Sequence, residues 1–203
     1  MANDAEEEWA APFGGDGEDS RSLAPFATTP DARIEEMIRL ARVTVDDVVA
    51  DLGAGDGAVL CLVWRHAKAK TGVGFEINDE LVKMAKKRLA EEGCPAMVGA
   101  WNAAASSGEG DADCGENCRG ALPSGYTIVN EDVLEEADLS RFTVVFTWLQ
   151  PWAVELLAPK LAEAIRGRGV RVISYQWPIT ALEKDFAVVV GVTKNMYMYE
   201  RRI

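Results

Sequence analysis

The chain has 203 residues, and its 33 acidic against 21 basic side chains give a formal net charge of −12. This length predicts one domain, and a hydrophobic content of 48% excludes a globally disordered chain. No apolar run approaches the roughly 18 residues of a membrane helix. The acidic N-terminus also lacks the apolar core of a secretory signal. We therefore expect a cytoplasmic or nuclear protein that is not secreted.

The excess charge lies in two segments. Residues 1–20 hold seven acidic and no basic side chains, and residues 102–125 hold four acidic and one basic. We expect residues 1–24 to be a disordered acidic tail and residues 25–203 to be one domain, with 102–125 as an acidic Gly/Ala/Ser-rich loop insertion. The negative charge disfavours nucleic acid as a partner, although the body outside these segments is nearly neutral.

Order is expected to begin near residue 25. Thr29 and Pro30 predict an N-cap and a first helical residue, and apolar residues recur at helical spacing over 34–41. A short apolar strand over 48–52 ends in Gly53-Ala54-Gly55-Asp56-Gly57. The pattern then predicts, in order, a helix over 58–68, a strand over 72–77 and a helix over 79–92 that Asn78 caps.

Around the insertion, residues 96–98 and 126–129 resemble pieces of one strand region. A strand over 143–148, a helix over 152–165 that Pro159 breaks or restarts, a strand over 170–175 and a hairpin over 186–200 follow. Strands that alternate with helices predict an open α/β sheet, mostly parallel, with helices on both faces and a C-terminal antiparallel hairpin. Ligands bind such sheets beyond the carboxyl ends of the strands.

The glycine loop suits close approach of backbone N–H groups to a ligand. Gly53, Gly55 and Ala58 also satisfy the dinucleotide pattern G-x-G-x-x-G/A, and Glu76 could bind ribose hydroxyls in either case. Asp51, at the end of the strand, would repel a pyrophosphate but attract an ammonium and a sulfonium. S-adenosylmethionine is therefore favoured over a dinucleotide, and the chain is short for a nicotinamide enzyme.

Three motifs carry a family resemblance: Asp51–Gly57, Gly74-Phe75-Glu76-Ile77-Asn78 and Asn130-Glu131-Asp132-Val133. They resemble successive motifs of the class I, seven-strand, Rossmann-like S-adenosylmethionine-dependent methyltransferases. The resemblance implies a site in which each motif holds one part of the cofactor. Asp51 would lie near the ammonium, and the Gly53 and Gly55 backbones would approach the methionine part. Glu76 would accept hydrogen bonds from both ribose hydroxyls. Ile77 would pack against the adenine ring, Asp132 would accept a hydrogen bond from the adenine N6 amine, and Val133 would offer its backbone N–H.

Further stretches resemble a narrower group. They are 25–30 (PFATTP), 148–151 (WLQP), 156–161 (LLAPKL) and 172–179 (VISYQWPI). They are similar to the small lysine methyltransferases of the ATP synthase c-subunit and the adenine nucleotide translocase, and to their prokaryotic relatives. In that group the segment before the first helix folds over the cofactor, which implies Phe26, Thr28 and Thr29 near the site. The mitochondrial members carry a membrane segment near the N-terminus, where this chain is acidic and polar.

Such a reaction is a direct SN2 transfer, to which an enzyme contributes mainly alignment. Trp148, Tyr175 and Trp177 follow two neighbouring predicted strands and are candidates for aromatic walls that desolvate a lysine amine. Gln150 is a candidate acceptor for a hydrogen bond from that amine. The Asn/Asp-Pro-Pro-aromatic pattern of adenine-N6 and glutamine methyltransferases is absent at 148–151.

Three hypotheses therefore remain. The first is a protein-lysine methyltransferase, with a Lys-rich protein as a candidate substrate that the acidic tail would attract. The second is a methyltransferase of RNA or a small molecule, and the third is a non-catalytic cofactor-binding subunit of a larger complex. No His-based triad is expected, because the only histidine, His66, lies in the predicted helix after the glycine loop and points away from the strand ends, and no metal site is expected. The sequence leaves the oligomeric state open.

Overall fold

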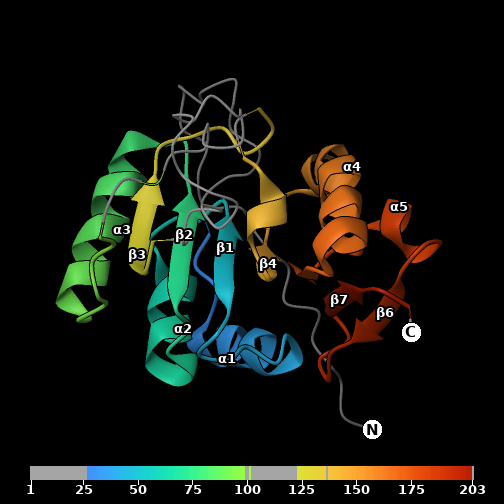
Figure 1. Cartoon of the computed structure of the whole chain (residues 1–203), viewed down its shortest axis with the longest axis horizontal. Helices are drawn as coiled ribbons and strands as arrows, with labels where there is room; N and C mark the ends of the chain where they lie inside the picture. Colours follow the sequence, from blue (N-terminus) through green and yellow to red (C-terminus); the bar gives the residue numbers. More distant parts are fainter. Residues whose placement is uncertain (1–26, 99–100, 102–122, 136, 203) are drawn as a thin grey trace, which may run out of the picture.

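A computed structural model describes residues 27–98, 101, 123–135 and 137–202. Over these residues, one seven-stranded sheet has the order β3-β2-β1-β4-β5-β7-β6 (Figure 1). In chain order the elements are α1 (Asp31–Leu40), β1 (Val48–Leu52), α2 (Ala58–Ala67), β2 (Thr71–Phe75), α3 (Asp79–Glu91), β3 (Gly125–Val129), the 3₁₀ turn η2 (Leu139–Arg141), β4 (Val144–Thr147), α4 (Pro151–Arg168), β5 (Arg171–Tyr175), α5 (Thr180–Glu183), β6 (Ala187–Val190) and β7 (Met196–Glu200).

The sheet is parallel from β3 to β5, where each neighbouring pair runs in the same direction. Only β7 is antiparallel, to β5 on one side and to β6 on the other. The predicted fold class, a mostly parallel sheet with a C-terminal antiparallel hairpin, is therefore confirmed. The carboxyl ends of β1, β2, β4 and β5 meet at one edge of the sheet, where ligands bind in this architecture.

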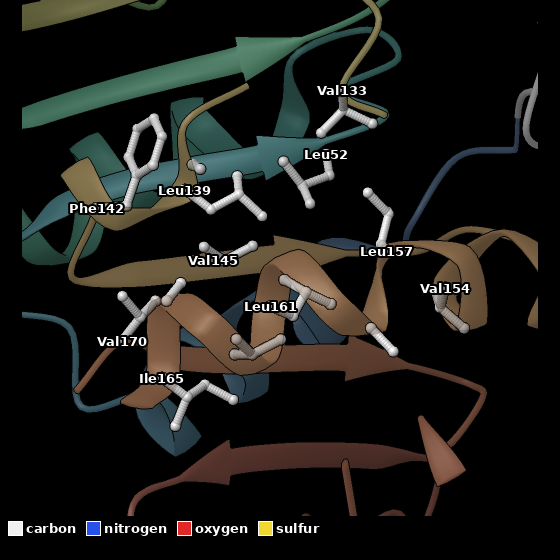
Figure 2. Close-up of a cluster of buried hydrophobic side chains, with 14 of the residues drawn as sticks. Leu52, Val133, Leu139, Phe142, Val145, Val154, Leu157, Leu161, Ile165 and Val170 are labelled. Carbon is white, nitrogen blue, oxygen red and sulfur yellow. The ribbon is translucent and has the colours of Figure 1, made fainter. Parts of the chain in front are cut away.

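Helices cover both faces of the sheet. One core cluster joins α1, α2 and α3 to one face. On the other face α4 packs Val154, Leu157, Leu161 and Ile165 against strand residues such as Val145 (Figure 2). Burying one such side chain is worth about 1.5–3 kcal/mol, so this packing holds the sheet edge in a fixed shape.

The predicted break at Pro159 is wrong, because α4 runs without interruption from Pro151 to Arg168. Leu157 and Leu161 are both fully buried and continue one apolar stripe past the proline. Their burial outweighs the roughly 3 kcal/mol that an internal proline costs a helix. Gly169, with φ of +71°, then ends the helix.

Two local predictions need adjustment. The helix α1 begins at Asp31 with Pro30 at the N-cap and no side-chain cap bond, so Thr29 is not its N-cap. Residues 96–98 do not continue β3 but lie beside it, since Ala96 forms an isolated parallel bridge with Tyr126. Asn78 does cap α3, accepting hydrogen bonds from two N–H groups of the first turn.

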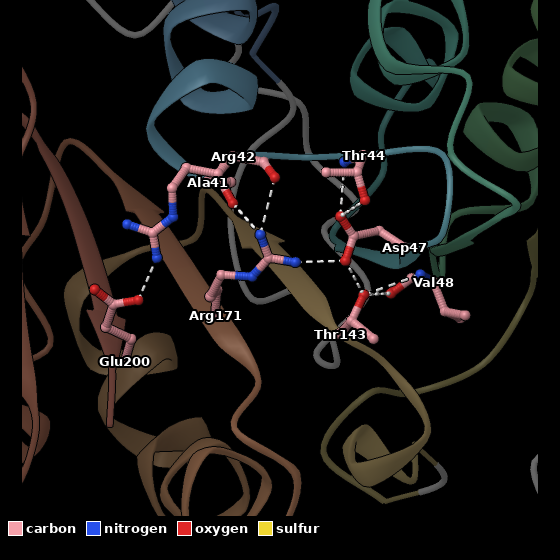
Figure 3. A network of polar contacts seen from close by, with 8 residues as sticks. All are labelled: Ala41, Arg42, Thr44, Asp47, Val48, Thr143, Arg171 and Glu200. Atoms are coloured by element: carbon pink, nitrogen blue, oxygen red, sulfur yellow. Dashed lines mark hydrogen bonds and ion pairs between the residues drawn. The ribbon is translucent and has the colours of Figure 1, made fainter. Parts of the chain in front are cut away.

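A saturated polar network closes the amino ends of β1, β4 and β5 (Figure 3). The Asp47 carboxylate accepts from the Thr44 N–H at 2.7 Å and the Thr143 hydroxyl at 2.6 Å. It also pairs with Arg171, whose guanidinium donates to the carbonyls of Ala41 and Arg42. These contacts fix the end of the sheet that lies away from the predicted site.

The predicted tail, residues 1–24, lies outside the described residues, as does most of the predicted insertion. Of that insertion, Pro123 accepts a hydrogen bond from the Thr71 hydroxyl and Gly125 begins β3. In the described part of the chain, no helix is long and apolar enough to cross a membrane.

Candidate active site

The glycine loop connects β1 to α2. Gly53, Gly55 and Gly57 have φ values of +78°, +53° and +79°, in the left-handed region that favours glycine. The Gly53 N–H donates to the Phe75 carbonyl at 3.0 Å. A Cβ on Gly53 would lie 2.7 Å from Leu149 Cδ2. Both the backbone conformation and the close approach of Leu149 therefore require glycine at position 53.

Asp51 is a buried carboxylate at the end of β1, 4% exposed. Its Oδ2 atom is buried and has no hydrogen-bond partner within the described residues. Burial, with the negative charges of Glu76 and Asp56, raises the pKa of Asp51 from 3.8 to about 8. A cation at Oδ2 would lower that pKa again, so a positively charged ligand is favoured at this position.

Glu76 follows β2 and links two loops of the site. Its Oε2 accepts from the Gly55 N–H at 2.9 Å, and its Oε1 accepts from the Asn78 N–H at 2.9 Å. A carboxylate oxygen has two lone pairs, so each oxygen can accept one more bond, as two ribose hydroxyls require. Glu76 is 9% exposed and close enough to Asp51 to raise its pKa.

The loops after β2 and β3 lie side by side. The Asn130 amide donates to the Ile77 carbonyl at 3.2 Å and to the Asp79 carboxylate at 3.0 Å. Ile77 is half-buried, which leaves part of its side chain open to contact a flat ring. Asn130 thus holds the predicted adenine contact in place, a role that the motif alone did not reveal.

Asp132 and Val133 form the next turn. Asp132 Oδ1 accepts from the Leu134 N–H at 2.8 Å, and the Val133 carbonyl accepts from Lys160 Nζ of α4 at 3.2 Å. The Val133 side chain is buried in the same cluster as Leu52, the last residue of β1 (Figure 2). This turn therefore reaches the carboxyl end of β1, beside the glycine loop.

Aromatic residues follow β4 and β5. The Trp148 and Tyr175 rings meet edge to face, with centroids 5.1 Å apart and planes at 65°. They become neighbours because Thr147 pairs with Ser174 in the sheet. Trp148 is half-buried and Tyr175 is 5% exposed, so most of what this pair exposes belongs to Trp148, and its role as an acceptor wall stays a prediction.

Gln150 and Trp177 each lie two residues after one member of this pair, Gln150 after Trp148 and Trp177 after Tyr175. Gln150 occupies the N-cap position of α4, and its side chain makes no cap hydrogen bond, so the amide is not committed to the helix. Trp177 is 40% exposed, and its carbonyl accepts from the Ser174 hydroxyl at 2.6 Å. Of the three aromatic residues predicted as walls, the structure brings Trp148 and Tyr175 into contact, and Trp177 lies farther along the chain.

The remaining predicted residues precede α1. Thr28 is exposed and Thr29 half-buried. Phe26 lies outside the described residues. A role for this segment over the cofactor stays a prediction.

Three residues near the carboxyl ends of the strands were not predicted as site residues from the sequence. Leu149 packs on Gly53, Thr147 Oγ is buried with no partner in the described part of the chain, and the same holds for Asn195 Oδ1 in the β6–β7 turn. Their signal was weak, because each depends on which strands become neighbours. Leu149 could have been found from its place within the 148–151 stretch.

These residues fit S-adenosylmethionine. The unpartnered Asp51 Oδ2 suits its ammonium, the left-handed glycines bring backbone close to a ligand, and Glu76 retains lone pairs for a diol. The buried carboxylate, the glycine backbone and the free lone pairs at this edge thus suit an amino acid joined to a nucleoside.

Comparison with known proteins gives a consistent result. No protein-family model matches the chain. A protein-lysine N-methyltransferase of Saccharolobus islandicus (strain REY15A) is 28% identical over 178 residues, covering 86% of this chain and 92% of that protein.

Solved structures share the fold. An RNA methyltransferase from Salinibacter ruber, crystallised with S-adenosyl-L-homocysteine, is 27% identical with a TM-score of 0.60, over 86% of this chain and 92% of that one. The magnesium protoporphyrin IX methyltransferase of Synechocystis PCC 6803, with bound S-adenosylmethionine, has a TM-score of 0.52 at 12% identity, over 85% and 77%. The second likeness concerns the fold alone.

The sheet order and these similarities indicate an S-adenosylmethionine-dependent methyltransferase with a seven-stranded, Rossmann-like fold. Among such enzymes it is similar to a protein-lysine N-methyltransferase. The predicted enzyme class and cofactor are thereby confirmed.

Proposed function

We propose that the chain methylates lysine side chains of a protein substrate. The observation that carries the proposal is the edge-to-face Trp148–Tyr175 pair, 5.1 Å between centroids, directly after β4 and β5. The adjoining residue Leu149 packs on Gly53 of the glycine loop, so the aromatic surface and the loop share one edge of the sheet. The similarity to a protein named as a lysine methyltransferase supports the same substrate.

The cofactor half of the site is assigned residue by residue. Asp51 binds the ammonium, the Gly53 and Gly55 backbones bind the methionine part, and Glu76 binds the ribose. Asp132 and Val133 bind the adenine edge while Ile77 packs on its face, and Thr28 and Thr29, with Phe26, cover the cofactor. When bound, S-adenosylmethionine supplies a methyl group made electrophilic by its sulfonium.

The acceptor half prepares the lysine. A lysine amine attacks only after it has lost its proton, and aromatic surroundings lower its pKa because they solvate the charged form poorly. In this proposal Trp148 and Tyr175 exclude water from the amine. The side-chain amide oxygen of Gln150 accepts one hydrogen bond from the amine N–H and orients the nitrogen lone pair. The exposed Trp177 contacts the chain that carries the lysine.

The acidic residues of the N-terminal segment support a basic protein partner, and the free cysteines support a reducing compartment. Residues 1–20 carry seven acidic side chains, which would attract a Lys-rich protein. Cys61 and Cys94 are free thiols, which fits the reducing cytoplasm or nucleus. Deleting residues 1–20 is then expected to weaken substrate affinity and its salt dependence; unchanged affinity would leave the segment without this role.

A second candidate is methylation of RNA. One observation favours it: the 27% identical structure with the TM-score of 0.60 is named as an RNA methyltransferase. Both candidates use the same cofactor residues and differ in the acceptor, so they are separable by the product.

The test is transfer of a tritiated methyl group into an extract of the source organism, split into RNase-treated and protease-treated halves. Label in protein that resists RNase and appears as methyl-lysine on hydrolysis supports the proposal. Glu76→Ala should abolish the label, and Trp148→Ala should lower it while cofactor binding persists. Label that survives protease and disappears with RNase would establish the RNA alternative instead.

A further inference from the structure

The turn between β6 and β7 is anchored on α1 by one carboxylate. Glu36 Oε1 accepts from the Thr193 N–H at 3.2 Å and from the Thr193 hydroxyl at 3.3 Å. The Glu36 side chain is only 13% exposed. The chain also approaches closely at Gly191, where a Cβ would lie 3.2 Å from Glu36 Oε1. This turn is therefore docked on the helix and has little freedom to move.

The same turn holds the end of β5. The Asn195 carbonyl accepts from the Gln176 N–H at 2.6 Å. Gln176 has φ of +69°, a left-handed conformation that is uncommon for a residue other than glycine and persists where surrounding contacts enforce it. Because Gln176 lies between Tyr175 and Trp177, this strained residue sets the directions in which both aromatic side chains leave the backbone.

Two further hydrogen bonds hold residues 174–179 in place. The Ser174 hydroxyl donates to the Trp177 carbonyl at 2.6 Å, and the Ile179 N–H donates to the Tyr199 hydroxyl at 2.7 Å. Residues 174–179 are thus held from β5 and β7 at once. Among these hydrogen bonds, only those from Thr193 to Glu36 reach α1; Met196 and Tyr175 also pack in the buried cluster that includes Ile34 of that helix.

We propose that Glu36 is a positioning residue for methyl transfer. It acts through the β6–β7 turn on Tyr175 and Trp177, which are called the acceptor wall below. The proposal rests on the proposed function, in which Tyr175 and Trp177 contact the acceptor. Removing the carboxylate leaves the Thr193 donors unpaired and frees the turn. Gln176 can then relax from its left-handed conformation, and the wall shifts. A displacement of about 1 Å can cost about 100-fold in rate when alignment is the enzyme's main contribution.

The helix α1 gives a matched set of variants. Glu36→Ala removes both acceptor oxygens, whereas Glu36→Gln keeps an oxygen able to accept from Thr193. The control is Glu35→Ala, because Glu35 is its neighbour on the same helix, is 44% exposed and contacts His66 at 3.5 Å. Each variant is measured well below its own melting temperature, so that a global loss of stability does not enter the rates.

The direct readout is ¹⁹F NMR of the full chain carrying 5-fluorotryptophan, with the Trp148 and Trp177 signals assigned by Trp→Phe substitution. In Glu36→Ala we expect the Trp177 signal to shift or broaden, and Glu35→Ala to match the unaltered chain. Calorimetry should give an S-adenosylmethionine affinity within about twofold of the unaltered chain in every variant. The rate of tritium transfer into RNase-treated extract should fall about tenfold or more in Glu36→Ala and recover in Glu36→Gln.

Unchanged Trp148 and Trp177 signals in Glu36→Ala overturn the proposal, as does a transfer rate equal to that of Glu35→Ala. Failure of the proposed function looks different. The unaltered chain would then transfer no label into RNase-treated extract, whatever Glu36→Ala does to the NMR signals.

Discussion

The strand β1 carries a buried aspartate near each end, and the two are treated in opposite ways. Asp47, just before the strand, is 5% exposed and Asp51, within it, is 4% exposed. The Asp47 carboxylate is saturated by Thr44, Thr143 and Arg171 (Figure 3). Asp51 Oδ2 has no partner within the described residues. A buried carboxylate that the chain satisfies holds the fold together, whereas one left open is available to a ligand.

The strand β4 repeats the contrast with a hydroxyl. Thr143, directly before β4, accepts from the Val48 N–H at 3.0 Å and donates to Asp47 at 2.6 Å. Thr147, the last residue of β4, is fully buried, and its Oγ is unpartnered in the described part of the chain. Asp47 and Thr143 at the amino ends of these two strands are thus bonded internally, whereas Asp51 Oδ2 and Thr147 Oγ toward the carboxyl ends have no partner in the described part of the chain.

The largest effect is expected at the saturated end. Asp47→Ala leaves the mostly buried Arg171 guanidinium without its carboxylate, and breaking such a pair costs about 3–5 kcal/mol of folding stability. Urea unfolding should show this loss. Calorimetry below the melting temperature should show an S-adenosylmethionine affinity unchanged within about threefold, because the network lies at the far end of the strands. Weakened binding at full folding would erase the contrast.

Asp51→Asn should do the reverse. Removing the charge that we propose receives the ammonium should weaken S-adenosylmethionine binding by about 100-fold, within the range of about 2–5 kcal/mol for a buried charge pair. The folding stability of the unliganded chain should hold or rise, because burying this carboxylate is costly. Equal affinities for the two chains would remove Asp51 from the site.

The difference between the two aspartates also predicts a pH dependence of S-adenosylmethionine affinity of about tenfold per pH unit. The pKa of Asp51 is raised to about 8, so binding an ammonium below that pH requires the carboxyl to release a proton. Affinity should rise by up to about tenfold per pH unit between about pH 5.5 and 7. Over the same range the unliganded chain should lose stability, because the folded state holds a proton that the unfolded state has released. Both slopes should disappear in Asp51→Asn; slopes that persist there belong to another group.

The smallest effect separates the two threonines of β4. Thr143→Val strips a hydrogen bond from Asp47 and leaves the Val48 N–H unpaired, which should cost about 1–2 kcal/mol. Thr147→Val replaces an unpartnered buried hydroxyl by a methyl of the same shape and should cost nothing measurable. Urea denaturation of the two variants side by side measures the difference. Comparable losses would mean that Thr147 is also bonded within the fold.

Much of this architecture could be predicted from sequence because its signals are local. The apolar run before Gly53, the cap at Asn78 and the hairpin near the C-terminus each predicted an element, and their alternation predicted the sheet. The negative charge of Asp51 at a strand end, together with the short chain, favoured S-adenosylmethionine over a dinucleotide. Pro159 misled because a local rule cannot weigh the buried stripe that carries α4 past it.

The acceptor half was less accessible, because its contacts join distant segments. That Leu149 packs on Gly53 depends on β4 lying next to β1, and that Asn195 holds Gln176 depends on β7 lying next to β5. Neither strand pairing can be predicted from the sequence of one of the two segments alone. Aromatic residues at strand ends could be singled out, but the contact of Trp148 with Tyr175 required the register of the sheet.

The central claim, that Asp51 is left unpartnered to receive the cofactor ammonium, is tested most directly by a double-mutant cycle. S-adenosylhomocysteine and its analogue lacking the amino group are titrated into the unaltered chain and into Asp51→Asn. We predict that losing the amino group weakens binding by about 100-fold in the unaltered chain and by less than about threefold in Asp51→Asn, a coupling of about 2 kcal/mol or more. An equal loss in both chains would contradict the account.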